Sequence, residues 1–506
     1  MYKTVLFTLF LLFSSIAECK LPNLSAREVK AKIEEILKAH ATYKELNTEI
    51  MERSLTNFCD ELDPMKVYFL ESEIEEWIHP EPDLLKKALQ GAEKGDFSLF
   101  QQIHALFIKA VARHNQIEET LSSKEMPKDV KHEELKNLGW AKTEEGLSDK
   151  ILKIKALQLE AAAKMGEESD RFFQHIQKRR LNREAELANK EESTRTTLTY
   201  ALKAIASALD AHTNYFTPSE ANQFIMQVQQ RLFGIGAQLR DDLDGLRVTH
   251  IIEDSPASHK MKINDKIIGV DGEPVIGLDI IEAVEKIRGE KGTTVQLSVL
   301  REIEGKLEKL EIPIVRGEIV LEEARLETSS EPYGDGVIAY LRLFSFYQDL
   351  KNSSALDIRK AIDQLKQEHK LKGVILDLRS NAGGLLSQAV SVTGLFITKG
   401  VIVSVKDNTG NVQHLRETEG KPAWDGPLFV LVNRASASAA EIVAQTLQDY
   451  GRALVLGDDH TFGKGTFQTF TLDPILSPKV NPMGEYKVTR GKYYTVSGKT
   501  PQLVGV

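Results

Sequence analysis

The sequence predicts a multidomain α+β protein with an all-helical N-terminal domain, a small strand-rich domain and an α/β core. Its 506 residues correspond to three or four domains at about 100 to 200 residues each. Apolar residues recur at helical spacing up to about Gln227, whereas short strands separated by turns begin near Arg231. From about Glu318 onward strands alternate with helices, which is typical of a largely parallel sheet covered by helices.

The composition excludes several classes of protein. Hydrophobic residues make up 42% and charged residues 27% of the chain, as in an ordinary globular protein. The net charge is −9, and no basic stripe is interleaved with aromatic residues, so nucleic acid is not expected as a partner. The two cysteines, Cys19 and Cys59, are too few for a disulfide framework or a thiolate zinc cluster.

Residues 1–19 are predicted to be a signal peptide. Lys3 precedes an apolar run from Val5 to Ile16, which is too short to span a bilayer. The mature chain is therefore expected to be exported across the cytoplasmic membrane, with a periplasmic location. Lipid attachment at Cys19, and with it a peripheral or lipid-anchored membrane association, is the alternative to simple cleavage. The sequence does not decide between a monomer and an oligomer.

Residues 20–227 are predicted to form the helical N-terminal domain. Val29, Ile33, Ile36 and Leu37 show the three- and four-residue spacing of an amphipathic helix. The histidines of this region have no metal-ligand spacing, and nothing in it resembles a reaction centre.

Residues 228–317 are predicted to form the strand-rich domain. Its expected elements are strands at 247–252, 266–270 and 293–300 and a helix at 278–287. The order Phe233-Gly234-Ile235-Gly236-Ala237, Asp254-Ser-Pro-Ala257 and Ile263 to Gly272 resembles a PDZ domain. In that family a glycine-containing loop, here Phe233, Gly234, Ile235 and Gly236, offers backbone N–H groups to the terminal carboxylate of a peptide, which adds a strand to the sheet. The resemblance implies protein or peptide partners with free, apolar C-termini; a small domain that only packs is the alternative.

Residues 318–506 are predicted to form the α/β core. Its expected strands lie at 337–343, 373–378 and 428–432, and its expected helices at 353–369, 385–396 and 439–450. Functional residues are expected in the loops at the strand ends.

Two serines, Ser436 and Ser438, lie between the buried strand at 428–432 and the helix that follows it. An oxyanion formed there would meet the unpaired N–H groups and the dipole of the helix N-terminus. The alternative is that both serines only cap the helix. The Gly-x-Ser-x-Gly motif that marks many nucleophilic serines at such junctions is absent.

A serine nucleophile needs a base, and Lys464 is the leading candidate. The histidines after Gly400 are His414 and His460, and neither has an evident acidic partner, so a Ser-His-Asp triad is unsupported. Lys464 lies among apolar and glycine residues, which favours a neutral amine. If residues 464–470 form a strand, Lys464 and Gln468 share one face, and Gln468 could orient the amine. A phosphate loop is disfavoured because a glycine, not Ser or Thr, follows the lysine.

The paired glycines Gly383 and Gly384 follow another buried strand. Glycines let a backbone approach a substrate closely and expose N–H groups, as an oxyanion site needs. An ordinary tight turn is the alternative.

Together these segments closely resemble the carboxy-terminal processing, or tail-specific, serine proteases. The resemblance covers roughly residues 25 to 506. It rests on Leu62 to Leu70, Asp210 to Tyr215, Asp377-Leu-Arg379, Gly383-Gly384, Ser436 to Glu441, Gln448 to Arg452, Thr461 to Thr466 and Lys492 to Tyr494. It implies a ClpP/crotonase-like protease core, and no metal or cofactor.

Carried over by position, the family's residue roles fall on a small set of residues. The family pattern places the nucleophile second in Ser-Ala-Ser and eleven residues before the aspartate of Gln-Asp-Tyr-Gly, a spacing that Ser438 and Asp449 meet. The resemblance implies Ser438 as nucleophile, Lys464 as general base, Gln468 as the residue that orients the lysine, and the N–H of Ala439 with one from Gly383-Gly384 as oxyanion donors.

The resemblance also sets the functional expectation. It implies an exported serine endopeptidase that recognises protein C-termini and degrades or processes unfolded or tail-marked proteins. A catalytically inactive PDZ scaffold or chaperone, and a hydrolase of small esters, are the alternatives. Family members with this kind of N-terminal region usually continue into a further helical domain, which is expected to be absent from a chain that stops at Val506.

Overall fold

The computed structural model describes residues 21–121, 126–127, 130, 139–165, 169–242, 245–275, 280–289, 291–320, 325–418, 420–472 and 479–506. The predicted signal peptide, including Cys19, lies outside these residues. The described chain divides into two compact units. One is Phe233–Gly317, and the other combines Pro22–Leu232 with Glu318–Val506.

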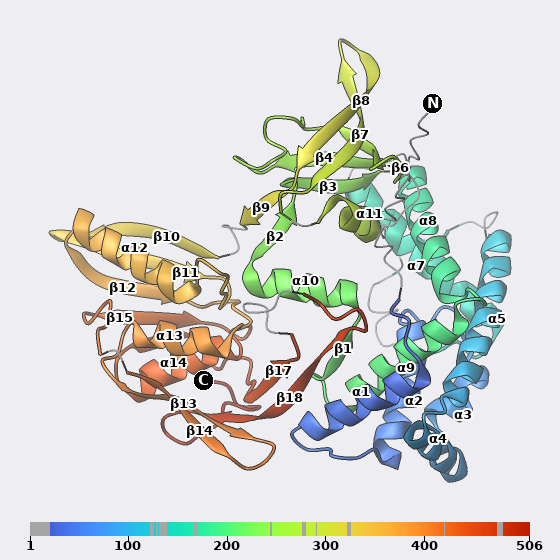
Figure 1. Cartoon of the computed structure of the whole chain (residues 1–506), viewed down its shortest axis with the longest axis horizontal. Coiled ribbons are helices and arrows are strands. Elements are labelled where there is room, and N and C mark those ends of the chain that lie inside the picture. The colour runs from blue at the N-terminus through green and yellow to red at the C-terminus, as the bar shows by residue number, and fades with distance from the viewer. Residues whose placement is uncertain are drawn as a thin grey trace, which may run out of the picture. The chain divides into compact units, whose positions relative to one another are not determined.

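Amphipathic helices build the N-terminal region, as the apolar spacing predicts (Figure 1). The helix α1 begins with a capping box in which Ser25 and Glu28 satisfy each other's backbone N–H groups. Most of the apolar faces meet in one core that also includes Tyr215 and Val488, whereas the end of α5 packs with α7 in a second, smaller cluster. The helices are α1 (Ala26–Ala39), α2 (Thr48–Leu62), α3 (Glu71–Ile78), α4 (Pro82–Lys94), α5 (Ser98–Leu121), α7 (Glu144–Met165), α8 (Ser169–Leu187), α9 (Ser193–Leu209) and α10 (Pro218–Gln229).

The N-terminal region also contributes a strand, which the sequence analysis did not predict. The strand β1 (Asn214–Phe216) pairs antiparallel with β18 (Glu485–Tyr494), and the two lie side by side in Figure 1. A strand of three residues is too short to show a periodicity of its own. The helical region is therefore joined directly to a sheet of the core.

The described residues of the strand-rich unit form a main sheet and the helix α11. Its sheet has the order β3-β4-β5-β7-β8, with β6 paired to β5, so that β3 is an edge strand. A separate two-stranded sheet, β2-β9, lies where the chain enters and leaves this unit. The elements are β2 (Arg231–Gly234), β3 (Ala237–Asp242), β4 (Gly245–Ile251), β5 (Lys266–Val270), β6 (Glu273–Pro274), α11 (Ile280–Ile287), β7 (Thr294–Ile303), β8 (Lys306–Val315) and β9 (Gly317–Val320).

The alternation of strands and helices in the core is confirmed, and it produces a five-stranded sheet of order β10-β11-β12-β15-β16. The pairs from β11 to β16 are parallel, whereas β10 and β11 form an antiparallel hairpin. The elements are β10 (Leu326–Tyr333), β11 (Gly336–Leu343), α12 (Ser354–Glu368), β12 (Leu371–Asp377), α13 (Leu386–Gly394), β15 (Leu428–Val432), α14 (Ala439–Asp449) and β16 (Leu454–Gly457).

The core holds a second sheet, which is antiparallel and which the sequence analysis did not anticipate. Its order is β1-β18-β13-β14, and β17 pairs with β18. The strands are β13 (Gly400–Asp407), β14 (Val412–Glu417), β17 (Thr466–Phe470) and β18. The pairings of β18 with β1 and with β13 join distant parts of the chain, so no local pattern indicates how this sheet is assembled.

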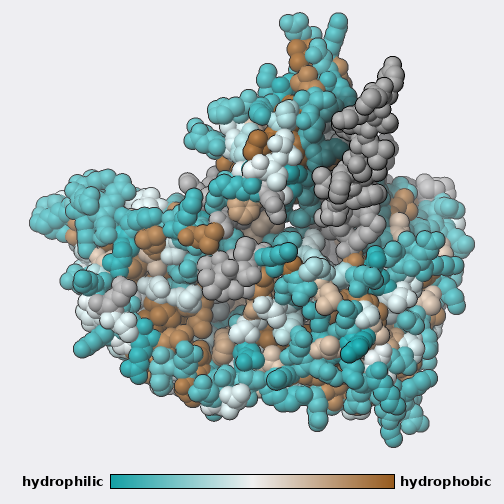
Figure 2. Space-filling model, in the orientation of Figure 1, coloured by the Kyte–Doolittle hydropathy of each residue, from teal (hydrophilic) through white to brown (hydrophobic). Residues whose placement is uncertain are grey.

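The helices of the described chain do not include a membrane-spanning candidate, since none is both long and apolar enough. The face in Figure 2 is mainly hydrophilic, with hydrophobic residues in smaller groups.

Candidate active site

Ser438 occupies a strained turn between β15 and α14. Its backbone has φ 55° and ψ −110°, a conformation that costs an L-residue about 1–3 kcal/mol and persists where the surrounding structure holds it. The Ser438 side chain makes no capping hydrogen bond to α14. The hydroxyl is therefore not used as a helix cap, and the chain forms a strained strand-to-helix turn although the Gly-x-Ser-x-Gly motif is absent.

The room for this turn comes from glycines of a different loop. A Cβ atom at Gly383 would lie 2.9 Å from Cβ of Ser438 and 3.0 Å from the carbonyl oxygen of Ala437. At Gly384 it would lie 2.3 Å from the carbonyl oxygen of Phe346. Both glycines also have positive φ angles, 103° and 143°. Only glycine can combine these contacts with these angles.

Ser436 has a different, structural environment. It is fully buried, its hydroxyl donates to the carbonyl of Leu378 (2.8 Å), and it accepts from the N–H of Asn433 (2.9 Å). These bonds close the turn after β15 and tie it to the end of β12. Ser438, by contrast, lines a cavity whose lining does not include Ser436.

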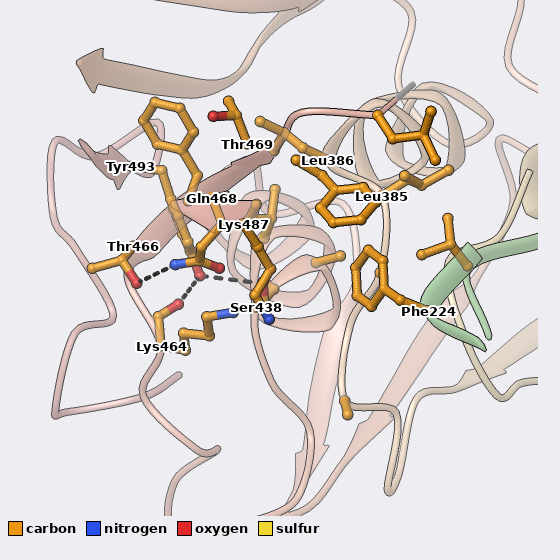
Figure 3. Close-up of a pocket in the computed structure, with 18 residues that line it drawn as sticks. Phe224, Leu385, Leu386, Ser438, Lys464, Thr466, Gln468, Thr469, Lys487 and Tyr493 are labelled. Atoms are coloured by element: carbon orange, nitrogen blue, oxygen red, sulfur yellow. Dashed lines mark hydrogen bonds between the residues drawn. The ribbon is translucent and has the colours of Figure 1, made fainter. Parts of the chain in front are cut away.

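That cavity has a volume of about 520 Å³ and brings together most of the residues singled out from the sequence. Figure 3 shows Ser438 between Lys464 on one side and the apolar side chains of Phe224, Leu385 and Leu386 on the other. The lining residues are Phe224, Val228, Ala382, Gly384, Leu385, Leu386, Ser438, Ala439, Ile442, Lys464, Thr466, Phe467, Gln468, Thr469, Phe470, Leu472, Lys487 and Tyr493. The cavity thus has a polar end at Ser438 and an apolar remainder.

Lys464 is half-buried, and its surroundings favour the neutral amine. Burial lowers the pKa of Lys464, and the positive charge of Lys487 lowers that pKa further. Glu441 and Asp210 act in the opposite direction but do not outweigh these effects. A lysine with a lowered pKa can accept a proton near neutral pH.

A buried carboxylate ties Ser438 to Lys464. Glu441 is fully buried, and its Oε2 accepts from the backbone N–H groups of Ser438 (2.7 Å) and Lys464 (2.9 Å). Its Oε1 accepts from the Thr461 hydroxyl (2.6 Å) and the Gly463 N–H (2.6 Å). One side chain therefore sets the separation between the serine loop and the lysine loop.

The strand that would place Lys464 and Gln468 on one face does not include Lys464. The strand β17 begins at Thr466, and its pairing with β18 shifts register between Phe467 and Gln468. Lys464 instead lies in the preceding loop, where the Glu441 bond holds its backbone and its carbonyl accepts from the Tyr493 hydroxyl. Lys464 and Gln468 still line the same cavity, but through loop geometry rather than strand alternation.

Two backbone N–H groups beside Ser438 are unused within the described chain. The N–H groups of Ala439 and Gly384 have no hydrogen-bond acceptor among the described residues, and both residues line the cavity. The N–H of Gly383, by contrast, donates to Oδ1 of Asn381 (2.8 Å). Of the two glycines predicted as oxyanion donors, Gly384 is the one with an available N–H.

The two histidines considered as bases lie elsewhere. His414 contacts the Ser404 hydroxyl (2.7 Å), and His460 contacts the carbonyl of Thr461 (2.7 Å). Neither is among the described residues that line the cavity.

Sequence reasoning missed two charged residues of this site. Glu441 follows Ser438 at the three-residue spacing of a capping box, so a local signal for it existed. Lys487 comes from β18, and no sequence signal connects it with Lys464. Its amine lies 5.5 Å from the ring centre of Phe224 and 5.7 Å from that of Phe216.

Of the predicted carboxylate loop, Phe233 and Gly234 belong to the strand β2, and Ile235 and Gly236 form the loop that leads into the edge strand β3. The carbonyl of Ile235 accepts from the N–H of Ala257 (2.8 Å), and that of Gly236 accepts from the N–H of Ile252 (2.9 Å). Gly236 has a φ of 78°, which turns the chain from the loop into β3. A fixed loop beside an unpaired strand edge is the arrangement that strand addition requires.

Comparison with known proteins agrees with these features. Three family profiles match the chain in order: tail specific protease N-terminal domain at residues 32–219, PDZ domain at 223–300 and peptidase family S41 at 337–506. Together they define a peptidase with a PDZ domain.

Relatives of this class were found over the greater part of the chain. The tail-specific protease of Haemophilus influenzae is 36% identical over 313 residues, which are 60% of this chain and 44% of that protein. The carboxy-terminal-processing protease of Bartonella bacilliformis is 34% identical over 314 residues, 60% of this chain and 67% of that protein. A solved photosystem II D1 C-terminal processing protease has a TM-score of 0.35 and 24% identity, covering 62% of this chain and 80% of that one. The match to the Bartonella protein shows that this chain belongs to the family of tail-specific, or carboxy-terminal processing, proteases.

Proposed function

We propose that this chain is an exported serine endopeptidase that captures protein C-termini with its PDZ domain and cleaves the captured polypeptide with Ser438 and Lys464. One observation carries the proposal. A single cavity combines a strained serine, a lysine with a lowered pKa, and two unused backbone N–H groups. Export is inferred from the N-terminal sequence alone.

The reaction begins with proton transfer from the Ser438 hydroxyl to the neutral amine of Lys464. The serine oxygen attacks the peptide carbonyl, and the resulting oxyanion accepts from the N–H groups of Ala439 and Gly384. The lysine ammonium then protonates the leaving amine as the C–N bond breaks. Water, deprotonated by the same lysine, hydrolyses the acyl-enzyme and restores the serine.

The substrate is an extended polypeptide rather than a small ester. The strand β17 contributes each of its residues to the cavity lining, and among the described strands it pairs with β18 only. A peptide can therefore add to the free edge of β17. The apolar walls formed by Leu385, Leu386 and Phe470 favour unfolded segments with apolar side chains.

Tail recognition raises the local concentration of substrate. A polypeptide held by its C-terminus in the PDZ domain reaches Ser438 as an intramolecular ligand, which increases the rate without any new contact at the cleaved bond.

The first test compares residues 20–506 with the variants Ser438→Ala and Lys464→Ala. Each is incubated with an unfolded protein that carries an apolar C-terminus, either free or amidated. We expect cleavage by the parent alone, and slower cleavage of the amidated substrate. Equal tail binding by all three proteins with no cleavage by any would contradict the proposal and favour a scaffold.

Lys487 provides a separate prediction about pH. Replacing Lys487 with methionine removes a positive charge that lowers the pKa of Lys464. The pKa of Lys464 should rise, so the neutral amine should form only at higher pH, and the acidic limb of the kcat/KM profile should move to higher pH. Lys487→Arg retains the charge and is the matched control. An unchanged limb in Lys487→Met would exclude this electrostatic role.

A further inference from the structure

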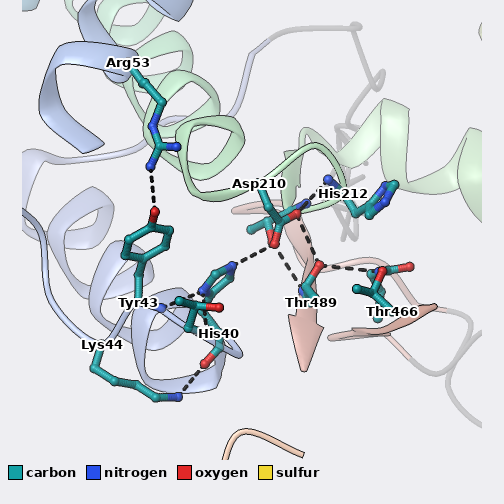
Figure 4. A network of polar contacts seen from close by, with 11 residues as sticks. His40, Tyr43, Lys44, Arg53, Asp210, His212, Thr466 and Thr489 are labelled. Atoms are coloured by element: carbon teal, nitrogen blue, oxygen red, sulfur yellow. Dashed lines mark hydrogen bonds and ion pairs between the residues drawn. The ribbon is translucent and has the colours of Figure 1, made fainter. Parts of the chain in front are cut away.

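A chain of hydrogen bonds connects the N-terminal helices with the candidate active site (Figure 4). Its centre is Asp210, just after α9. The Asp210 carboxylate accepts from the N–H groups of His212 (2.7 Å) and Thr213 (2.8 Å), and from Nε2 of His40 (2.8 Å). It also accepts from the hydroxyl of Thr489 in β18 (3.2 Å). Asp210 therefore bridges the helical region and the sheet that contains β17.

His40 donates to Asp210 as a neutral imidazole. Its Nδ1 accepts from the backbone N–H groups of Thr42 (3.2 Å) and Tyr43 (2.9 Å), which requires a lone pair on that nitrogen. The ring hydrogen therefore lies on Nε2, which points to Asp210. The side chain of His40 is only 2% exposed, so this arrangement is held by packing. His40 therefore holds the Asp210 carboxylate in a fixed orientation through the Nε2–H bond.

The charge of Asp210 sets the direction of the next two hydrogen bonds. An ionised carboxylate can only accept, so the Thr489 hydroxyl must donate its single hydrogen to Asp210. The same hydroxyl can then only accept, and its donor is Nε2 of Gln468 (3.4 Å). Nε2 of Gln468 also donates to the Thr466 hydroxyl (3.1 Å).

This direction decides which end of the Gln468 amide faces the cavity. Because both bonds occupy the amide nitrogen, the amide oxygen points the other way. Figure 3 shows the nitrogen turned toward Thr466 and the oxygen turned away from it. Among the described residues, Oε1 of Gln468 has no hydrogen-bond donor, so it can accept from the Lys464 amine across the same cavity.

We propose that Asp210, with Thr489 as its link, is a positioning residue that holds the Gln468 amide with its oxygen toward Lys464. The inference rests on the proposed function, because it assigns Lys464 the role of base. It adds that an acidic residue of the N-terminal region, fixed by His40, orients the catalytic centre.

Asp210 also acts on Lys464 through its charge. The titratable groups that interact with Lys464 are Lys487 of β18, Glu441 of α14, His212 and Asp210 itself. Burial alone would raise the pKa of Asp210, but its hydrogen bonds, led by that from His40, hold this pKa well below its usual range. Asp210 is thus ionised wherever the enzyme would work, and it opposes the effect of Lys487.

The test measures the rate at which a fluorophosphonate labels Ser438, since this reaction needs the activated serine but no peptide substrate. Thr489→Val removes the linking hydroxyl with little change of volume, and Thr489→Ser keeps it. We expect labelling of Thr489→Val to be about tenfold slower than that of the parent, and that of Thr489→Ser to remain close to it. Because Asp210 keeps its charge in both variants, the acidic limb of the pH profile should stay in place.

Asp210→Asn removes the negative charge of Asp210 and so tests its effect on the pKa of Lys464. It should lower the plateau rate and also move the acidic limb to lower pH, because the pKa of Lys464 falls when the negative charge is removed. A merely structural role would change the melting temperature without moving this limb. Thr489→Val keeps the test valid if Asp210→Asn does not fold.

The outcomes distinguish the inference from the function on which it rests. If the parent is labelled and Thr489→Val is labelled equally fast, the positioning role is wrong while the serine–lysine mechanism stands. If the acidic limb of the pH profile of Asp210→Asn stays in place or moves to higher pH, the proposed effect of the Asp210 charge on the pKa of Lys464 is wrong. If the parent is labelled no faster than Ser438→Ala, the proposed function fails and the inference fails with it.

Discussion

Lys464→Arg is expected to abolish peptide cleavage as completely as Lys464→Met. A guanidinium stays protonated at every pH that the folded protein tolerates, so it cannot take the proton from Ser438. General-base catalysis contributes about 10²- to 10⁴-fold, and we expect kcat/KM to fall by about 10³-fold in both variants. The measurement is initial-rate cleavage of an unfolded protein from pH 6 to pH 10.

Lys464→Arg distinguishes two roles of Lys464, that of a base and that of a positive charge, which Lys464→Ala removes together. If Lys464 acted only as a positive charge, arginine would retain much of the activity and methionine would not. Lys499→Arg, at an exposed position in the same C-terminal segment, is the control for a lysine-to-arginine change as such. Substantial activity in Lys464→Arg would therefore overturn the assignment of Lys464 as base.

Glu441→Gln is expected to damage both stability and activity. The carboxylate accepts four hydrogen bonds in a fully buried position. An amide nitrogen in place of one oxygen would face two donors and leave them unsatisfied. Each buried donor left without an acceptor costs about 1–3 kcal/mol, so two of them should lower the free energy of unfolding in urea by about 2–6 kcal/mol.

The loss of activity should exceed what reduced stability explains. Glu441 fixes the backbone of both Ser438 and Lys464, and a misplacement of about 1 Å between reacting groups can cost about 10²-fold in rate. We expect at least this loss in kcat at a temperature where the variant is still folded. Asp449→Asn, which removes an exposed carboxylate from the end of the same helix, should leave kcat unchanged. A folded Glu441→Gln protein with parental kcat would show that the carboxylate does not align the two loops.

Much of the fold follows from local pattern. The strand at Leu428–Val432 has the predicted bounds. A short apolar and β-branched run between Pro427 and Asn433 is too short for a buried helix and indicates a strand. The helices of the N-terminal region follow from apolar spacing in the same way. The strand β1 does not, and neither does the pairing of β13 with β18, because these hydrogen bonds join segments far apart in the chain.

The candidate site was likewise predictable from the sequence only in part. The resemblance to a known family placed Ser438, Lys464 and Gln468, and each lines the same cavity. Strand alternation does not explain why Lys464 and Gln468 lie together, because β17 begins at Thr466 and does not include Lys464.

By itself, the sequence determined the kinds of domain, the family and the residue types that carry the chemistry, since these depend on periodicity and on short motifs. Only the tertiary structure decided which serine faces the cavity, which glycine N–H is available and how Lys464 is surrounded. It also brought Lys487 and Asp210 beside Lys464. The physical reason is that burial and the Coulomb interaction depend on distance in space, and β18 brings together charges that lie more than 250 positions apart in the chain.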